Sequence, residues 1–405
     1  MVLVTKGSAS FVIFKEGGTY CAQNGKTGKI NSGTDASTVI QSAINALSPS
    51  GGRIHIKSGK YVLTSPLTIE SNSIHITGES KAGDIFFTND AKYHGFSNKI
   101  ATILIADKIN GIEIGRTKLV FGTTIENMGI SGIDLDAVMG DDIYSTGAGI
   151  RVYRAEVTRI ENVQVQRKEY GIYFAPTPPW AYDRVIDVVM MDNVLLCFNL
   201  YGIYAEGWVT GVRVNTLFGY INQRGLIHAS PQYDWIMRDV WSNADSWNSL
   251  NQRDAPIYIG TGRDVTLENV TIAGQKGPVL CPVPLLWLDC NKVGSHGAKI
   301  RINNITLLET QSDAVRVDGN GDYVFINGIY AGLHGFYGGN GTVKGSVIRY
   351  DASGVKICVN GGAVSCGAPK PDWFVNVDKV ESVYGHTNAS GGGENGASST
   401  HGMPD

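Results

Sequence analysis

One short motif recurs through most of the chain: an apolar residue, a polar residue, asparagine and a second apolar residue. Its asparagines are Asn127, Asn162, Asn193, Asn269 and Asn304, while Thr216, Asp239 and Gly328 occupy the same place in less regular copies. Neighbouring copies lie 23 to 35 residues apart. A spacing that never falls below a fixed minimum but often exceeds it predicts a solenoid. Each coil would have three short strands, and the additional residues would be insertions in the turns. We expect the asparagine side chains to be buried and to hydrogen-bond from coil to coil.

A second strand pattern follows the motif within each coil. Its first and third residues are mostly aliphatic and should point inward, so that the middle residue points outward. The outward residues predicted in this way are Arg151, Tyr173, Tyr204, Ile227, Tyr258, Trp287, Arg316 and Arg349. Two positions further along, the same face carries Glu206 between Ala175 and Ala229, and Asp289 in a later coil. We therefore expect Tyr173, Tyr204, Tyr258 and Trp287 to form an aromatic row on an exposed sheet.

The two ends of the chain depart from the repeat. Residues 1–34 contain short apolar stretches separated by glycine turns. A helix is predicted over residues 35–47, because Asp35 can cap it and its apolar residues form one stripe. The glycine- and serine-rich residues 386–405 predict a flexible tail. The expected organisation is therefore N-terminal strands in 1–34, one domain of strand coils in 35–385, and the tail.

The helix segment, the glycine-led strands Gly51–Ile56 and Gly59–Leu63 and the asparagine repeat together resemble the pectate-lyase-like superfamily. This resemblance implies an all-β fold, a right-handed parallel β-helix with the helix as N-terminal cap, here of about ten to eleven coils. The superfamily contains pectate lyases, polygalacturonase-like hydrolases and phage tailspikes, so it implies a fold and not one reaction. Its catalytic motifs are mostly missing, since Gly140-Asp141-Asp142 is not followed by Gly-His-Gly.

Aromatic side chains favour a groove that binds carbohydrate along this sheet. Trp180, Trp208, Trp241 and Trp247 lie in the middle coils near the aromatic row, and Arg151 and Arg253 add polar contacts. Ordinary cross-strand packing also favours aromatic residues, so the row has two interpretations. We take polysaccharide binding as the better one.

Hydrolysis of a glycoside needs two carboxyl groups, which lie about 5–10 Å apart. Acids on adjacent coils meet this requirement, because stacked strands are about 4.8 Å apart. We expect Glu206 to be the proton donor, partly shielded from water by Trp180, Trp208 and Trp235, with Asp183 or Asp234 as its partner. Asp254 with Asp289 is the second choice. A glycoside hydrolase that requires no cofactor is the favoured function.

Two other functions remain open. A polysaccharide lyase would abstract a proton beside a uronate carboxylate and needs a base and a neutralising cation. Candidate bases are Arg151, Lys168, Tyr204, Arg224, Arg253, Tyr258 and Lys292, and weak candidate ligands for Ca²⁺ are Asp134, Asp136, Asp141 and Asp142. The third hypothesis is a glycan-binding surface or tailspike-type protein without catalytic activity.

Charge and cysteine content narrow the partners and the location. The net charge of −3, from 34 basic and 37 acidic residues, argues against nucleic acid as a partner. No apolar run is long enough to span a membrane, and no signal peptide is visible. Cys281 with Cys290, and Cys358 with Cys366 across a hairpin at Asn360-Gly361-Gly362, could form disulfides, although buried free thiols explain the cysteines equally well. We expect an extracellular or cell-surface protein; the sequence does not indicate its oligomeric state.

Overall fold

The computed structural model is built almost entirely from β-strands, with one α-helix in the part that it describes. The described residues are 9–81, 101–133, 144–176, 185–246, 254–260, 263–276, 279–291, 297–308, 310, 312–333, 347–351, 355–366, 374–375 and 382–388. The chain divides into two compact units, Met1–Arg213 and Val214–Asp405, here called unit 1 and unit 2.

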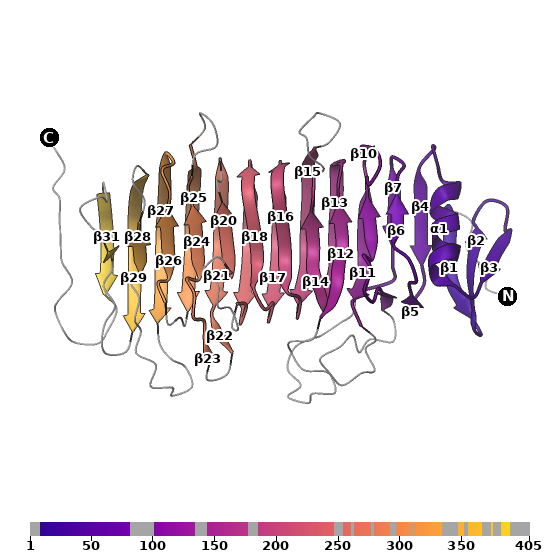
Figure 1. Ribbon diagram of the computed structural model, residues 1–405, viewed down its shortest axis with the longest axis horizontal. Coiled ribbons are helices and arrows are strands. Elements are labelled where there is room, and N and C mark those ends of the chain that lie inside the picture. The colour runs from indigo at the N-terminus through magenta and orange to yellow at the C-terminus, as the bar shows by residue number, and fades with distance from the viewer. Residues whose placement is uncertain are drawn as a thin grey trace. The chain divides into compact units, whose positions relative to one another are not determined.

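Unit 1 begins with three antiparallel strands and the helix. The strands are β1 (Phe11–Glu16), β2 (Thr19–Asn24) and β3 (Ile30–Gly33). The predicted helix is present as α1 (Ala36–Ala46), and Asp35 caps it by accepting the N–H of Thr38 at 2.9 Å. Its apolar stripe is buried against β2, β3, β5 (Gly59–Val62) and β6 (Leu67–Ile69), at the indigo end of the ribbon in Figure 1.

The remaining strands of unit 1 form parallel ladders in which each strand pairs with its counterpart in the next coil. The first ladder contains β4 (Gly52–Ile56), β7 (Ile74–Thr77), β11 (Thr124–Ser131), β13 (Ala155–Gln166) and β15 (Ile186–Cys197). The second contains β6, β9 (Ile112–Ile114), β12 (Ser145–Val152), β14 (Lys168–Phe174) and β16 (Tyr201–Thr210). Shorter pairings complete the unit. β5 pairs with β8 (Thr102–Ile105), β8 pairs with the last residues of β11, and β10 (Val120–Phe121) pairs with β13.

Unit 2 repeats this arrangement. Its first ladder contains β19 (Ile236–Asn243), β21 (Val265–Ala273), β25 (Lys299–Leu308), β27 (Tyr323–Leu333), β29 (Lys356–Cys366) and β31 (Ser382–Asn388). Its second contains β18 (Gly225–Tyr233), β20 (Ile257–Gly260), β24 (Leu286–Asp289), β26 (Val315–Asp318), β28 (Ile348–Tyr350) and β30 (Phe374–Val375). The strand β17 (Arg213–Tyr220) precedes β18, and β22 (Gln275–Lys276) and β23 (Val279–Leu280) form a small antiparallel pair.

The core consists of aliphatic side chains that stack in register from coil to coil. Ile125 pairs with Ile160, and Ile160 with Met191; in unit 2, Leu267 pairs with Ile302. All five side chains are buried. Full burial of one such side chain stabilises the fold by about 1.5–3 kcal/mol. Stacked parallel strands of this kind confirm the repeat that the sequence predicts.

The asparagine ladder is confirmed, but its expected burial is wrong. The Asn162 amide donates to Asn127 Oδ1 at 2.6 Å, and the Asn193 amide donates to Asn162 Oδ1 at 3.1 Å. Their backbones are left-handed, with φ between 50° and 57°, and Asn193 is exposed. The motif therefore bends the chain between two strand segments, and the bend turns the amide outward while the apolar residues on both sides point inward.

The predicted hairpin near the C-terminus is also wrong. Asn360-Gly361-Gly362 lies inside β29, which pairs with β27 in one register from Lys356 to Cys366, and Gly361 makes the same left-handed bend with φ 71°. Cys358 and Cys366 are therefore at opposite ends of one strand. Cys281, Cys290 and Cys358 are thiols, so the disulfide alternative fails for the described cysteines. Of the predicted tail at 386–405, the first three residues belong to β31 and the remainder lies outside the described residues.

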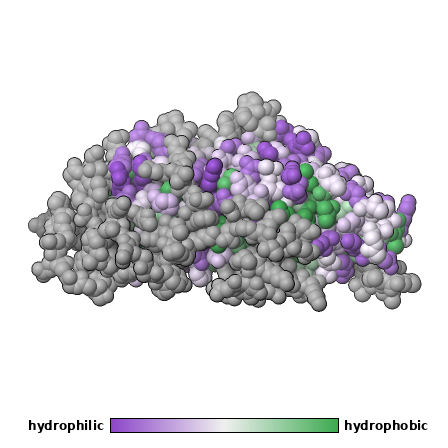
Figure 2. All heavy atoms as spheres, turned by 60° about the horizontal axis from the view of Figure 1, so that its bottom comes forward, coloured by the Kyte–Doolittle hydropathy of each residue, from purple (hydrophilic) through white to green (hydrophobic). Residues whose placement is uncertain are grey.

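The outer surface is mixed in character. Figure 2 shows one face on which described hydrophobic residues form a local patch among hydrophilic ones. Large exposed hydrophobic side chains include Phe121, Val157 and Val188 in unit 1, and Trp241 and Tyr330 in unit 2. No described helix is long and apolar enough to cross a membrane.

Candidate functional site

The predicted outward row is present in unit 1. Arg151 pairs with Glu113 on one side and Tyr173 on the other, and Tyr173 pairs with Tyr204. The residues on either side of each, such as Ile172 and Phe174, are buried in the core. Arg151, Tyr173 and Tyr204 are half-buried, so the row lies on the outer side of β12, β14 and β16 and is partly accessible to solvent.

Two further tyrosines join this row and make an aromatic cluster, here called the tyrosine face. Tyr170 pairs with Tyr201, and they lie three residues before Tyr173 and Tyr204 on the same strands. The ring centroid of Tyr170 lies 4.6 Å from that of Tyr173 and 5.0 Å from that of Tyr204. The ring centroids of Tyr201 and Tyr204 are 4.9 Å apart. Tyr170 and Tyr201 were not predicted as site residues, although the signal for them was the sequence Tyr-Gly-Ile-Tyr, which occurs in both strands.

Glu206 is the exposed carboxylate of the tyrosine face. The Tyr173 hydroxyl donates a hydrogen bond to Glu206 Oε2 at 2.6 Å. Burial first, and then the nearby Glu206, raise the pKa of Tyr173 above its ordinary value, and burial with Glu169 does the same to the pKa of Tyr170. Both phenols therefore stay protonated, and they can act as hydrogen-bond donors to a carboxylate or to a ligand.

Arg151 closes one end of the tyrosine face. Its guanidinium lies 4.7 Å from the ring centroids of both Tyr153 and Tyr173. Tyr153 also donates to the buried Glu113 at 3.3 Å, and Glu113 accepts from the Asn110 amide at 2.7 Å. These contacts hold the arginine between two rings, where it can offer N–H groups to a bound sugar.

The corresponding row in unit 2 differs from the prediction in register and in exposure. His228, not Ile227, pairs with Tyr258, and Ile227 and Ala229 are buried in the core. Tyr258 and Trp287 lie in the predicted row, but they are only 3% and 6% exposed. The expected open aromatic row is therefore wrong for these two residues.

Carboxylates and arginines follow the same strands of unit 2. Asp289 pairs with Asp318, and Asp351 follows the next strand in the same position. Arg316 stacks on Trp287 at 4.7 Å and its Nε lies 2.9 Å from Asp318, while Arg349 Nε lies 2.7 Å from Asp351. Asp289 accepts from the Tyr258 hydroxyl at 3.1 Å and from the Asn291 amide. The paired arginines make Asp318 and Asp351 structural groups, whereas the contacts of Asp289 named here are with neutral donors.

Other predicted site residues do not belong to either row. Trp235 is completely buried and cannot shield a surface carboxylate. Trp241 is exposed, but it belongs to β19 in the first ladder of unit 2. Asp234 is exposed at a left-handed bend between β18 and β19. Asp254 is buried, with Arg224 Nε 3.9 Å away.

Lys168, a candidate base for a lyase, is also buried and faces three carbonyl groups. Its Nζ donates to Ala106 O at 2.8 Å, Ile109 O at 2.8 Å and Thr146 O at 2.6 Å. Burial lowers the pKa of Lys168 to about 8. The ammonium group thus fastens two neighbouring turns and has no access to a polymer.

Several candidates lie outside the described residues: Trp180, Asp183, Trp247, Arg253, Lys292, Asp134, Asp136, Asp141 and Asp142. The same holds for the side chain of Trp208, although its backbone belongs to β16. Among the residues that are described, no group of three or more His, Cys, Asp or Glu is arranged to hold a metal ion.

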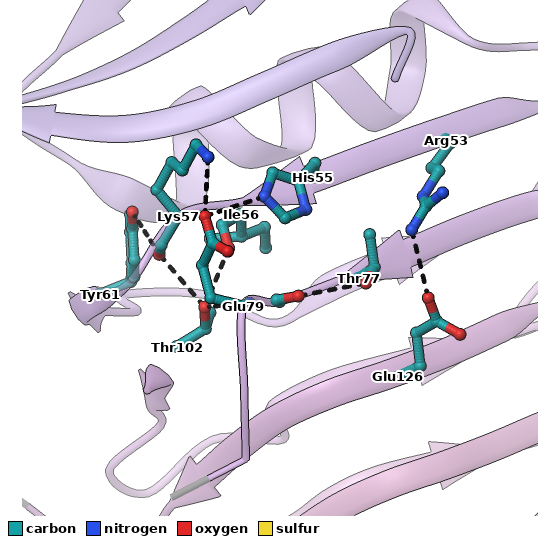
Figure 3. A network of polar contacts seen from close by, with 10 residues as sticks. Arg53, His55, Ile56, Lys57, Tyr61, Thr77, Glu79, Thr102 and Glu126 are labelled. Atoms are coloured by element: carbon teal, nitrogen blue, oxygen red, sulfur yellow. Dashed lines mark hydrogen bonds and ion pairs between the residues drawn. The ribbon is translucent and has the colours of Figure 1, made fainter. Parts of the chain in front are cut away.

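A polar cluster on the first coils of unit 1 was not predicted. Figure 3 shows Glu79 between His55 and Lys57, with Lys57 Nζ 2.7 Å and His55 Nε2 3.1 Å from its Oε1, while Arg53 lies 3.4 Å from Glu126. Lys57 and His55 lower the pKa of Glu79. The alternation Arg53-Ile54-His55-Ile56-Lys57 was the signal for it. Because its carboxylates are neutralised by cations, this cluster is better suited to holding the coils together than to proton transfer.

Comparison with known proteins shows similarity in fold only. No protein-family model matches the chain, and no curated protein matches it. A solved structure of DFA-IIIase from Arthrobacter chlorophenolicus A6 in complex with GF2 has 11% sequence identity and a TM-score of 0.58, over 89% of this chain and 96% of that one. A structure of the same enzyme without its lid has 11% identity and a TM-score of 0.55, over 88% of this chain and 96% of that one.

Proposed function

We propose that the chain is an extracellular enzyme that hydrolyses a polysaccharide at the tyrosine face of unit 1, with Glu206 as the catalytic carboxylate. The observation that carries this proposal is the 2.6 Å hydrogen bond between Tyr173 and the exposed Glu206, at the edge of four clustered tyrosine rings. The half-buried rings of Tyr170, Tyr173 and Tyr204 suit the C–H faces of a sugar, while the buried Tyr201 supports them from beneath the surface. The adjacent exposed carboxylate of Glu206 can reach the glycosidic oxygen of a bound chain.

The tyrosines favour a hydrolase over a lyase. A lyase that used Tyr173 or Tyr170 as its base would need a readily ionised phenol. Burial and the neighbouring carboxylates raise the pKa of both side chains, which keeps them protonated at neutral pH. In addition, the buried Lys168 cannot reach a substrate. Arg151 and Tyr204 are the candidate bases on this face for the lyase alternative, whereas Glu206 is the exposed carboxylate that a hydrolase requires.

A second carboxylate completes the hydrolytic pair that this chemistry requires. Within the described part of unit 1, we propose Glu169 as this carboxylate. Tyr170 forms a hydrogen bond with Glu169. Burial first, and then the charges of both Glu169 and Glu206, raise the pKa of Tyr170, so the two glutamates are near the same ring. Asp183, which the sequence predicts as the partner of Glu206, is the alternative second carboxylate.

We further propose that the coils form a right-handed parallel β-helix of the pectate-lyase-like superfamily, capped by α1. The parallel ladders and the left-handed asparagine bends support this assignment. The similar fold of DFA-IIIase, solved in complex with GF2, is consistent with a role in carbohydrate chemistry.

The test compares Glu206→Gln with Glu161→Gln on a panel of neutral and acidic polysaccharides. Glu161 is a matched control, because it is a partly exposed glutamate of unit 1 on β13, in the other ladder. Loss of a general acid costs about 10²–10⁴-fold in rate. We expect this loss for Glu206→Gln, which keeps the shape and the bond from Tyr173, and near wild-type rates for Glu161→Gln.

The products identify the reaction. New reducing ends without ultraviolet absorbance indicate hydrolysis, whereas absorbance from an unsaturated sugar indicates elimination and contradicts the hydrolase. Binding without cleavage supports the glycan-binding alternative. If Glu206→Gln cleaves the substrate at the wild-type rate, Glu206 has no catalytic role.

A further inference from the structure

Unit 2 carries a row of outward-pointing side chains on its first ladder, outside both rows described above: two exposed aromatic residues with two half-buried threonines between them. Trp241 on β19 pairs with Thr271 on β21, Thr271 with Thr306 on β25, and Thr306 with Tyr330 on β27. The neighbours of each residue along its strand, such as Val240 and Ser242, are buried. All four side chains therefore point out of the coil.

The two ends of this row are unusually open. Trp241 is 51% exposed and Tyr330 is 40% exposed. The ring of Phe218 on β17 meets Trp241 edge to face, with centroids 5.2 Å apart, and so supports the indole. The Trp241 and Phe218 rings therefore form a supported aromatic platform that is open to solvent.

Exposed amides lie beside the row at the bend of the same coils. The Asn269 amide donates to Asp239 Oδ1 at 3.1 Å, and the Asn304 amide donates to Asn269 Oδ1 at 3.3 Å. Each ladder bond uses one of the two N–H groups of an amide. The surface thus combines ring faces with donors and acceptors at each coil, which is the combination that a sugar ring with its hydroxyl groups requires.

We propose that this surface, from Phe218 and Trp241 across Thr271 and Thr306 to Tyr330, is a second glycan-binding site, separate from the tyrosine face. It binds a neutral glycan chain that runs along the stack of coils. Stacked strands are about 4.8 Å apart, so Trp241 and Tyr330, three strands apart, are separated by roughly 14 Å. An extended glycan places successive rings at a similar step, so the two aromatic residues bind rings separated by the two threonines.

Charge selects a neutral glycan over an acidic one. None of the five side chains is charged, and the nearby Arg238 and Glu268 are paired with each other at 2.5 Å. The exposed Asp239 beside Trp241 adds a negative charge that would repel an acidic glycan. A protein partner is less suited, because the aromatic ends are interrupted by hydroxyl groups and bordered by amides, whereas the core of a protein interface is continuous and depleted of polar groups. The proposal rests on the proposed carbohydrate function but involves no catalytic residue.

The test is native affinity electrophoresis of the full chain in gels that contain barley β-glucan, laminarin, xylan, dextran or inulin, with polygalacturonate as the acidic comparison. Trp241→Thr and Tyr330→Thr each remove one aromatic ring of the row and replace it with threonine, the residue that occupies the two positions between them. We expect at least one neutral glycan to retard the wild type, and each variant to weaken that retardation by about tenfold in apparent Kd, which corresponds to about 1.4 kcal/mol. Phe325→Thr is the matched control: it is also exposed, but it lies on β27 before the bend, outside the row, and should be retarded like the wild type.

Three results would overturn the proposal: no retardation of the wild type by any neutral glycan, equal retardation of the wild type and both variants, or a change of oligomeric state in Trp241→Thr with unchanged retardation. Circular dichroism confirms that the variants fold. Glu206→Gln should be retarded like the wild type, which separates this surface from the catalytic proposal. If Glu206→Gln is fully active while Trp241→Thr loses retardation, the surface site stands and the proposed catalytic carboxylate falls.

Discussion

Val157 and Val188 adopt a backbone conformation that β-branched residues rarely take. Their φ angles are 56° and 51°, and both side chains are exposed at bends between strand segments. Glycine and serine occupy left-handed bends elsewhere in unit 1, for example Gly122 and Ser73. A left-handed residue with a Cβ atom costs about 1–2 kcal/mol, and asparagine tolerates the conformation better.

Val188→Asn should therefore raise the free energy of unfolding by about 1 kcal/mol. The matched control is Val62→Asn, at an exposed valine in β5, where asparagine should lower stability because it is unfavourable in a strand. Chemical denaturation of both variants checks the prediction. A loss of stability in Val188→Asn similar to that of Val62→Asn would contradict the role of the bend.

Asp245 in unit 2 should make the free energy of unfolding depend on pH. It is completely buried and accepts hydrogen bonds from Asn222 N at 2.7 Å, Asn222 Nδ2 at 2.8 Å and Ser242 Oγ at 2.6 Å. Burial raises the pKa of Asp245 from 3.8 to about 7. The folded protein therefore binds this proton more tightly than the unfolded chain does, and the resulting stabilisation is lost as the pH rises from about 4 to 7.

Asp245→Asn should remove this dependence. One pKa unit corresponds to about 1.4 kcal/mol, so the variant should equal the wild type near pH 4 and exceed its stability above pH 7 by up to roughly 4 kcal/mol. Asp264→Asn, at a half-exposed aspartate of the same unit, is the matched control, because it keeps Asp245. Parallel pH profiles for Asp245→Asn and the wild type would show that Asp245 is not the titrating group.

At the scale of the element, the asparagine bends join consecutive coils. Asn162 is the middle rung: it donates to Asn127 and accepts from Asn193, which in turn accepts from Lys81 Nζ at 2.6 Å. Asn162→Gly keeps the left-handed bend but removes two ladder bonds, whereas Asn127→Gly removes one. Since one hydrogen bond contributes about 0.5–1.5 kcal/mol, Asn162→Gly should lose about 1 kcal/mol more than Asn127→Gly in thermal or denaturant unfolding. Equal losses would mean that the ladder contributes nothing beyond the bend.

The elements also show how far the sequence determines the site. Alternation located Tyr173 and Tyr204 correctly, because each lies between two residues that can only be buried. It failed at Ile227, because Leu226 and Ile227 are both apolar and both buried, so that alternation could not choose between Ile227 and His228. The burial of Tyr258 and Trp287 could not be predicted either, since it depends on contacts with chain that is distant in sequence. The sequence cannot reveal the bond between Tyr173 and Glu206 for the same reason.

At the scale of the whole molecule, stability comes from stacked coils and not from covalent cross-links among the described cysteines. Cys21, Cys197, Cys281 and Cys290 are buried thiols, and Cys358 is a partly buried one. A disulfide typically contributes about 2–4 kcal/mol to the free energy of unfolding. Because the described cysteines form none, the stability of this part of the chain comes from the apolar core and the hydrogen-bonded ladders. The thiols also remove one of the arguments for an extracellular location, which now depends on the proposed substrate.

This arrangement predicts the behaviour of the thiols. Burial raises the pKa of Cys281 to about 12, and it raises the pKa of Cys290 as well. Because only the thiolate reacts, both residues should resist alkylation at pH 8 in the folded protein and react once the chain unfolds. The unfolding midpoint should be the same with and without a reducing agent. Mass spectrometry of alkylated peptides locates the modified residues, and a midpoint that falls when reductant is added would show that a disulfide stabilises the fold after all.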